Sequence, residues 1–144
     1  MAIVLPNGIL NNPPLGYVRQ WILESAQVLA IVDMQRDLFQ PHNDTQTSMV
    51  FLRRKSDEEK MQPSDYPIFM AVTDKIGHDK RGNTIYRRDA AGTDIVVDTE
   101  TTVQTVEHGQ VVERLITEKS LVVDDQLPEV PPLYHSWARD HGVE

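Results

Sequence analysis

Two apolar runs near the start of the chain lack the alternation of polar and apolar residues that marks a half-buried strand. Residues 2–5 read AIVL, and residues 28–34 read VLAIVDM. Strands that are buried on both faces have this composition, most often in parallel sheets. The sequence therefore predicts two buried strands of the parallel kind.

A helix is predicted between these two strands. Pro13 and Pro14 cannot continue a strand, but they suit the first turn of a helix, and Asn12 suits the N-cap position before it. After Leu15 the apolar positions fall three or four residues apart, which indicates one face of a helix that runs to about residue 25. These positions are Val18, Trp21, Ile22 and Ala26.

A third strand is predicted at residues 48–52, within the stretch TSMVFLRR. The segment that connects it to the second strand is about a dozen residues long and shows no helical period, which favours an antiparallel return over a right-handed crossover. We therefore expect the three strands to lie side by side in one twisted sheet, with the third strand antiparallel to its neighbours.

The chain changes character beyond residue 56. Residues 55–62 are charged and predict a linker or a short helix, and residues 66–72 are apolar. Next come short β-prone runs with turn clusters between them, then a proline-rich break and a short helix. The runs are 94–97, 101–106, 111–116 and 121–123, the turn clusters are 79–83 and 107–110, the break is 127–132, and the helix is 133–141. We divide the chain into residues 1–56 and an acidic, β-rich extension, residues 57–144.

The composition limits the chemistry of the chain. Of its net charge of -8, residues 1–56 hold +1 and the remainder -9, so any contact with nucleic acid has to be local or supplied by a partner. The sequence has no cysteine, which excludes disulfides, thiolate zinc sites and a cysteine nucleophile. No apolar stretch approaches the roughly 20 residues of a membrane span. We expect a cytoplasmic protein that makes no membrane contact.

The stretch NNPPL, residues 11–15, resembles the Asn-Pro-Pro-aromatic loop with which many enzymes hold the amino group of adenine. In that loop an aromatic ring stacks on a base that has been flipped out of the duplex. Leu15 takes the place of the ring and cannot stack, and the stretch leads straight into the predicted helix. We interpret it as a helix start, and we assign no catalytic residue to this chain.

A wider resemblance covers residues 1–89. The stretches MAIVLPNGIL, VRQWILE, VLAIVDMQRDLFQPHNDTQTSMVFLRRK and FMAVTDKIGHDKRGNTIYRRD resemble, in this order, the later part of the catalytic domain in the N6-adenine DNA methylase family, the modification subunit of type I restriction systems. The resemblance implies an α/β fold, with residues 1–56 as the terminal part of a Rossmann-like sheet whose last strand is antiparallel.

The same resemblance implies S-adenosylmethionine as cofactor, DNA as substrate, and the specificity and restriction subunits of a type I system as partners. In the family, the cofactor loop and the catalytic Asn-Pro-Pro-aromatic loop lie on strands that precede the one at residues 2–5. This chain lacks both motifs, so we expect it to need the missing N-terminal part of the methyltransferase. By itself it should bind no cofactor and be inactive.

The resemblance also implies one candidate contact to DNA, and the basic residues of the chain suggest others. Phe39, in DLFQP, resembles the family's phenylalanine that stacks on the extruded adenine, and the alternative is that its ring only fixes the loop to the core. The basic residues around the turn at 79–83 are candidates for the DNA backbone, and the alternative is that they are solvated turn charges. These residues are Lys75, Lys80, Arg81, Arg87 and Arg88.

Two other functions remain open. Residues 28–39 resemble the opening strand of the isochorismatase-like hydrolases, in which an aspartate at the place of Asp33 works with a cysteine that this chain lacks. The chain could instead be a truncated product or a non-enzymatic module, whose strand edge at residues 2–5 is left to pair with a partner. His42, Asp44 and His78 show no metal-ligand spacing, and we predict no metal site.

Overall fold

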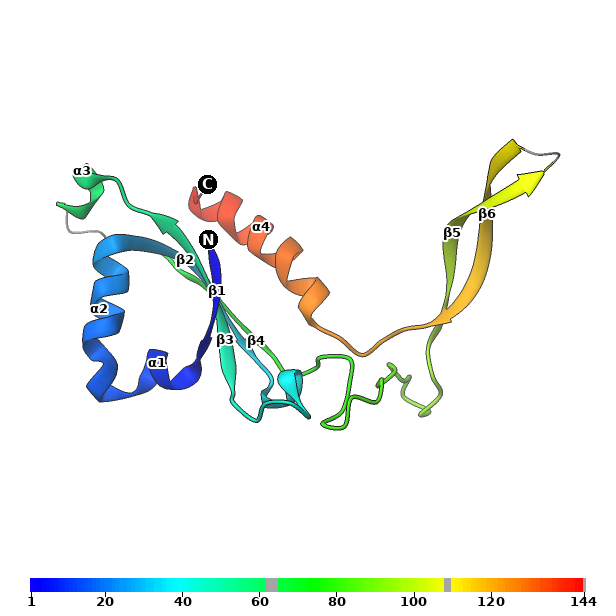
Figure 1. Ribbon diagram of the computed structural model, residues 1–144, viewed down its shortest axis with the longest axis horizontal. Coiled ribbons are helices and arrows are strands. Elements are labelled where there is room, and N and C mark those ends of the chain that lie inside the picture. The colour runs from blue at the N-terminus through cyan, green and yellow to red at the C-terminus, as the bar shows by residue number, and fades with distance from the viewer. Residues whose placement is uncertain (62–64, 108–109, 144) are drawn as a thin grey trace. The chain divides into compact units, whose positions relative to one another are not determined.

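The computed structural model describes residues 1–61, 65–107 and 110–143. The chain divides into two units (Figure 1). The first, which we call the sheet unit, comprises residues 1–83 and 125–144, and the second, the hairpin unit, comprises residues 84–124. None of the described helices is long and apolar enough to cross a membrane.

The sheet unit contains a mixed sheet of four strands in the order β1-β3-β2-β4. β3 lies between β1 and β2 and is antiparallel to both, and β4 is parallel to β2. The prediction that the three N-terminal strands lie side by side, with the third reversed, is confirmed. The strands are β1 (Ala2–Pro6), β2 (Ala26–Met34), β3 (Thr47–Arg54) and β4 (Phe69–Thr73).

The predicted helix between β1 and β2 is present. α1 (Asn7–Asn11) and a 3₁₀ turn, η1 (Pro13–Leu15), precede α2 (Gly16–Ser25). The two prolines occupy the start of η1, as their missing amides predict. Asn12 stands at the N-cap position of η1, as predicted, although its side chain makes no capping hydrogen bond there.

The core of the sheet unit lies between α2 and the sheet. Val28, Val50 and Leu52 are buried, and Ile22 of α2 packs against them. Trp21, which the periodicity placed on the same apolar stripe, is 65% exposed. The apolar face of α2 is therefore wider than its contact with the sheet, and the Trp21 side of that face is exposed to solvent.

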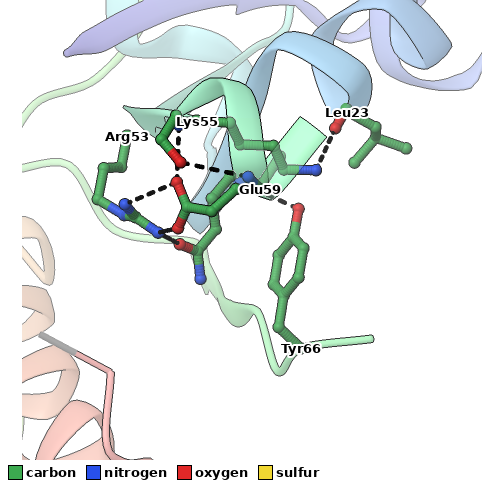
Figure 2. Close-up of polar contacts among 8 residues, drawn as sticks. Leu23, Arg53, Lys55, Glu59 and Tyr66 are labelled. Atoms are coloured by element: carbon green, nitrogen blue, oxygen red, sulfur yellow. Dashed lines mark hydrogen bonds and ion pairs between the residues drawn. The ribbon is translucent and has the colours of Figure 1, made fainter. Parts of the chain in front are cut away.

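A buried lysine directly after β3 contacts the end of α2 (Figure 2). Lys55 is only 9% exposed, and its Nζ donates a 2.6 Å hydrogen bond to the carbonyl of Leu23 in the last turn of α2. The Tyr66 hydroxyl accepts from the Val28 amide at 3.2 Å, and its ring centre lies 5.8 Å from the same Nζ. A cation at a helix C-terminus is stabilising because the helix dipole is negative there.

Next to this lysine, α3 (Asp57–Lys60) begins in a capping box. The Ser56 hydroxyl accepts from the Glu59 amide, and the Glu59 carboxylate accepts from the Ser56 amide. Arg53 reaches the same carboxylate at 2.7 Å (Figure 2). Residues 55–62 were predicted to be a linker or a short helix, and residues 57–60 form a short helix. Residue 62 lies outside the described residues.

The structure corrects the expected burial of β1. The sequence predicts a strand that is buried on both faces, whereas Ile3 is 38% and Val4 41% exposed. The reason is the position of β1 at the end of the sheet, next to β3 alone. The strand therefore has the composition of an interior strand and the position of an edge strand.

The boundary between the units differs from the predicted division at residue 56. β4, from the apolar segment 66–72, pairs with β2, and α4 (Val130–His141) packs its Tyr134 and Trp137 rings 5.6 Å from the ring of Phe69. Both ends of the predicted extension therefore belong to the sheet unit. Phe69 pairs with Ala30, on the face opposite the one that α2 covers, so α2 and α4 lie on opposite sides of the sheet (Figure 1).

The C-terminal helix begins earlier than predicted. Residues 127–132 were expected to block regular structure, but Leu127–Glu129 forms a 3₁₀ turn, η3, and α4 begins at Val130 with its two prolines in the first turn. Proline is tolerated there because the first amides of a helix have no partner within it. The helix ends at Gly142, whose φ of 62° is the left-handed cap conformation.

The hairpin unit consists mainly of β5 (Val96–Glu107) and β6 (Gln110–Leu121), which pair antiparallel in a sheet of their own. The short runs that the sequence predicts at 101–106 and 111–116 lie within these two strands, whereas those at 94–97 and 121–123 overlap them only at residues 96–97 and 121. The turn expected at 107–110 includes residues 108 and 109, which lie outside the described residues. Most described side chains of both strands are exposed.

Two loops ten residues apart share one geometry, which the sequence analysis did not notice. Asp79 and Asp89 each accept the amides of the residues two and four positions ahead through Oδ1, and a glycine with φ near 84° follows three positions after each. Aspartate at the start of a turn and glycine in the left-handed position are the residues that such hairpin loops require. The sequences DKRGN and DAAGT are therefore two copies of one turn.

Candidate functional site

The candidate site lies where β1 and β2 end. Both strands run antiparallel to β3, so they are parallel to each other and their carboxyl ends meet at one edge of the sheet. In open α/β sheets ligands bind outside this edge. Asn7 follows β1 directly, and Asp33 is the last residue but one of β2.

Asp33 is the centre of a polar cluster at this edge. Its Oδ1 accepts from the Asn7 side-chain amide at 2.8 Å and from the Ser48 hydroxyl at 3.1 Å, and its Oδ2 accepts from the Gln46 side-chain amide at 3.2 Å. The Thr73 hydroxyl at the end of β4 donates to the Asp33 carbonyl at 3.2 Å. The cluster therefore ties together the ends of all four strands.

These contacts give Asp33 a structural role. The carboxylate accepts from the side-chain amides of Asn7 and Gln46, and it shares the one hydroxyl hydrogen of Ser48 with Asn7 Oδ1, which lies closer to that hydroxyl, at 2.7 Å. Such donors keep a half-buried charge stable. Catalysis by a hydrolase of the kind that residues 28–39 resemble also needs a nucleophilic cysteine, and the sequence has none. The geometry thus supports the interpretation of Asp33 as the end of a strand.

Phe39 lies on the loop that leaves this edge. The 3₁₀ turn η2 (Arg36–Phe39) follows β2, and the Gln35 side chain caps it by accepting from the Asp37 amide. The carbonyl of Phe39 accepts from the amides of His42 and Asn43 at 3.0 and 2.9 Å. The Phe39 side chain is 39% exposed, so its ring is held by an ordered turn and is partly open to solvent.

An ion pair closes the same loop. Arg36 donates to both carboxylate oxygens of Asp44, at 3.0 and 2.8 Å, and Gln40 donates to the same carboxylate at 2.8 Å. The hydrogen bond from Arg36 holds the pKa of Asp44 below its ordinary value. The loop between β2 and β3 is thus fixed at both of its ends.

The remaining sequence candidates are spread over both units. Lys75, Lys80 and Arg81 belong to the sheet unit, whereas Arg87 and Arg88 belong to the hairpin unit. Arg87 lies 3.6 Å from Asp124, and Arg88 lies 2.9 Å from Asp94. The two arginines therefore face carboxylates of their own unit, which lowers the positive charge that they offer to phosphates.

The motif NNPPL takes no part in the hydrogen bonds of the Asp33 cluster described above. It forms η1 and the approach to α2, where the Arg19 guanidinium donates to the carbonyls of Ile9 and Asn12 at 2.9 Å. These contacts support its interpretation as a helix start. Within the described part of the chain, no group of three His, Asp or Glu side chains could hold a metal ion.

The sequence pattern did not predict three residues of the cluster, namely Asn7, Gln46 and Ser48. Asn7 directly follows β1, and Ser48 lies at the start of β3. Polar residues are ordinary at both positions. Only the pairing of Asp33 with Ser48 across β2 and β3 brings them together. A signal was present, since Asp33 is the only charged residue in the apolar run 28–34, and a charge there needs partners.

One apolar hollow lies away from this edge. It has a volume of about 330 Å³ and lies between α4 and the opposite face of the sheet, with Phe51, Phe69 and Tyr134 in its lining. No family model matches this chain, and no curated protein matches it. A function therefore has to be inferred from the geometry of the sheet and its edge.

Proposed function

We propose that this chain is the terminal part of the catalytic domain of an adenine-specific DNA methyltransferase of the type I modification-subunit kind. The observation that carries the proposal is the order β1-β3-β2, with β3 reversed between two parallel strands. This is the arrangement that the resemblance implies for the last strands of a Rossmann-like methyltransferase sheet. The remaining strands would continue the sheet beyond β1.

In this proposal the complete enzyme transfers the methyl group of S-adenosylmethionine to the amino nitrogen of adenine in DNA. The reaction needs a held cofactor and a held base, and catalysis would come from their positioning and from electrostatic stabilisation. The motifs that perform these tasks in the family are absent from this chain. Its own contribution would be the loop that carries Phe39 and the polar cluster that supports this loop.

The position of Phe39 supports a role in holding the flipped base. The ring lies at the carboxyl edge of two parallel strands, on a turn that is fixed by hydrogen bonds and is 39% exposed. An exposed ring on a rigid loop can stack on a base at little entropic cost. Lys80 and Arg81, at the tip of the Asp79 turn, are the proposed contacts to the DNA backbone.

The isolated chain provides the first test. Incubated with DNA and S-adenosylmethionine carrying a labelled methyl group, it should transfer no label, because it lacks the cofactor and catalytic motifs. Robust turnover would contradict the proposal. The coding DNA upstream of Met1 provides the second test, and an in-frame segment that encodes Asn-Pro-Pro followed by Phe or Tyr is the expected finding.

Phe39 can be tested in a longer protein, which we call the joined protein, in which such an upstream segment precedes this chain. Phe39→Ala should lower kcat/KM for methyl transfer roughly tenfold or more, since base stacking on an aromatic ring contributes about 1–3 kcal/mol. Fluorescence of 2-aminopurine at the target position should fall in parallel, because fewer bases would be extruded. Phe39→Trp should preserve both signals, and Leu38→Ala on the same turn is the control. Equal losses in Phe39→Ala and Leu38→Ala would reduce Phe39 to a structural residue.

A second function is supported by the exposed strand β1. A non-enzymatic module that joins a partner through this edge would need neither cofactor nor catalytic motifs. Size-exclusion chromatography separates the two ideas, because a well-behaved monomer would argue that the edge needs no partner.

A further inference from the structure

β1 presents an open edge whose first four residues carry no feature that protects them from pairing. It is the terminal strand of the described sheet, and residues 1–6 contain no charged side chain. Natural edge strands are commonly protected by lysine, by inward charges or by bulges. The only device of this kind on β1 is Pro6, at its last position.

The hydrogen bonds to β3 establish which backbone groups of β1 face outward. Met1 and Leu52 exchange two bonds of 2.8 Å, and the Asn7 amide donates to Gln46. In an antiparallel pair, residues bonded to the partner strand alternate with residues that point away. The odd-numbered residues of β1 therefore bond to β3, and the amides and carbonyls of Ala2 and Val4 point to the open edge.

This outward pattern is self-complementary. If a second copy of β1 lies antiparallel along the edge, with the two-fold axis at Ile3, Ala2 of each copy faces Val4 of the other. Each of these two pairs can exchange two backbone hydrogen bonds. Pro6 lies beyond the paired positions, and α1 begins only at Asn7, so neither obstructs the approach. An axis at Val4 would instead place the ring of Pro6, which has no amide, against Ala2.

We propose that this chain pairs with a second copy of itself through β1, in the antiparallel register centred on Ile3, so that the two sheets become one. The proposal deepens the second function above by naming the partner, and it is independent of the methyltransferase assignment. Ile3 pairs with Val50 of the core and so lies on the face of the sheet that α2 covers. In the dimer the two Ile3 side chains meet on this face, and exposed apolar surface is buried.

The pairing competes with completion of the methyltransferase sheet, because both would use the same edge. It also buries little surface, as each copy contributes five residues of one strand. Stable interfaces usually bury upwards of about 1,000 Å², so the dimer should be weak and concentration-dependent. A covalent trap is therefore a sharper test than a mass measurement alone.

The absence of native cysteine makes single-cysteine variants unambiguous. Across the axis Ile3 forms a non-hydrogen-bonded pair, for which the Cα atoms are about 4.5 Å apart, a separation that a disulfide can span. With oxidised glutathione as the oxidant, Ile3→Cys should form a disulfide-linked dimer roughly tenfold faster than Met70→Cys, since its effective concentration is higher. Met70 is the control because it is 71% exposed on β4, at the other end of the sheet.

Val4→Pro tests the backbone bonds. The Val4 amide points outward, so proline there removes no bond to β3, but it removes one donor from each of the two Ala2–Val4 pairs. The double variant with Ile3→Cys and Val4→Pro should form the disulfide-linked dimer only as fast as Met70→Cys does. Its circular dichroism spectrum should equal that of Ile3→Cys alone. The proposal is overturned if Ile3→Cys cross-links no faster than Met70→Cys, if Val4→Cys cross-links in its place, or if Val4→Pro keeps its fold and the fast rate. None of these outcomes tests the methyltransferase proposal, which is tested separately by methyl transfer in the joined protein.

Discussion

At the scale of single residues, this protein places its polar groups where the sheet needs partners. Asp33 is the clearest case, since a carboxylate in an apolar strand would be costly without donors. Asn7 supplies them from the segment after β1, and Gln46 and Ser48 supply them from the segment where β3 begins. The same carboxylate that suggests an active-site residue in the sequence therefore acts as a junction between strands.

Asp33→Asn should destabilise the sheet unit. The amide nitrogen of the new side chain would face a donor, and charge-assisted hydrogen bonds of this kind contribute about 1.5–3 kcal/mol, so we expect a loss of about 2 kcal/mol. Urea unfolding followed by circular dichroism measures it. Asp44→Asn is the matched control on the neighbouring loop, where the carboxylate is 66% exposed, and its midpoint should hardly move. Equal midpoints for the two variants would refute the structural role of Asp33.

Glu59 should titrate well below an ordinary glutamate. The hydrogen bond from Arg53, followed by that from the Ser56 amide, lowers the pKa of Glu59 from 4.5 to about 2. Because the pKa in the folded state is depressed, the stability from these contacts is present above pH 4.5 and is lost as the pH falls towards 2.

Carboxyl ¹³C shifts of Glu59, recorded by NMR over this range, check the titration. Arg53→Gln should raise its midpoint towards the ordinary value, whereas Arg54→Gln, at the exposed neighbour, should not. If Arg54→Gln raised the midpoint as much, a general loss of positive charge would explain the shift better than the Arg53 contact.

At the scale of elements, each helix of the sheet unit is attached by a few named contacts. α2 is held by Ile22 in the core and by Lys55 at its C-terminus, and α4 is held by two aromatic rings on Phe69. α4 comes from the far end of the sequence. Its attachment therefore decides whether the opposite face of the sheet is covered.

Trp137→Ala should weaken this attachment. Removal of a partly buried indole costs apolar contact and leaves a gap beside Phe69, for which we expect a loss of about 2 kcal/mol in the free energy of unfolding. Leu133→Ala on the same helix is the control, because Leu133 is 59% exposed and exposed positions change stability by about 0.5 kcal/mol or less. Chemical denaturation of both variants provides the comparison, and a control as destabilised as Trp137→Ala would show that α4 is held in another way.

At the scale of the whole molecule, the two units should differ in local stability. β2 is buried between neighbouring strands, with Val32 only 4% exposed, whereas β5 and β6 form a ribbon of two strands whose side chains are largely in solvent. A two-stranded ribbon is marginal in water. Backbone amides open locally where few apolar contacts hold them.

Hydrogen exchange should therefore proceed much faster in β5 and β6 than in β2 and β3. Mass spectrometry of peptides from each pair of strands measures the difference, with β3 as the internal standard for global opening. Equal protection in both sheets would mean that the ribbon is covered, by a partner or by a second copy, and that its exposure in the isolated chain has been overestimated.

Local pattern was sufficient for the elements that neighbouring residues determine. The apolar runs, the proline pair and the spacing of the apolar positions predicted β1, α2, β2 and β3 within a few residues, and the short link before β3 predicted its reversed direction. The candidate site was predicted only in part. Phe39 lies on the loop after β2, and its role in stacking stays a prediction. The cluster around Asp33 was not foreseen because its members meet only after the strands have paired.

The sequence by itself determined which segments become strands and helices and how three of the strands run, because hydrophobic periodicity and the chemistry of proline act over a few residues. Only the tertiary structure decided that β1 lies at an edge, that β4 and α4 return to the first sheet, and that the basic residues fall into two units. These outcomes depend on pairings between residues that are far apart in the chain, such as Ala30 with Phe69 and Phe69 with Trp137, and no local pattern encodes the partner of an open strand.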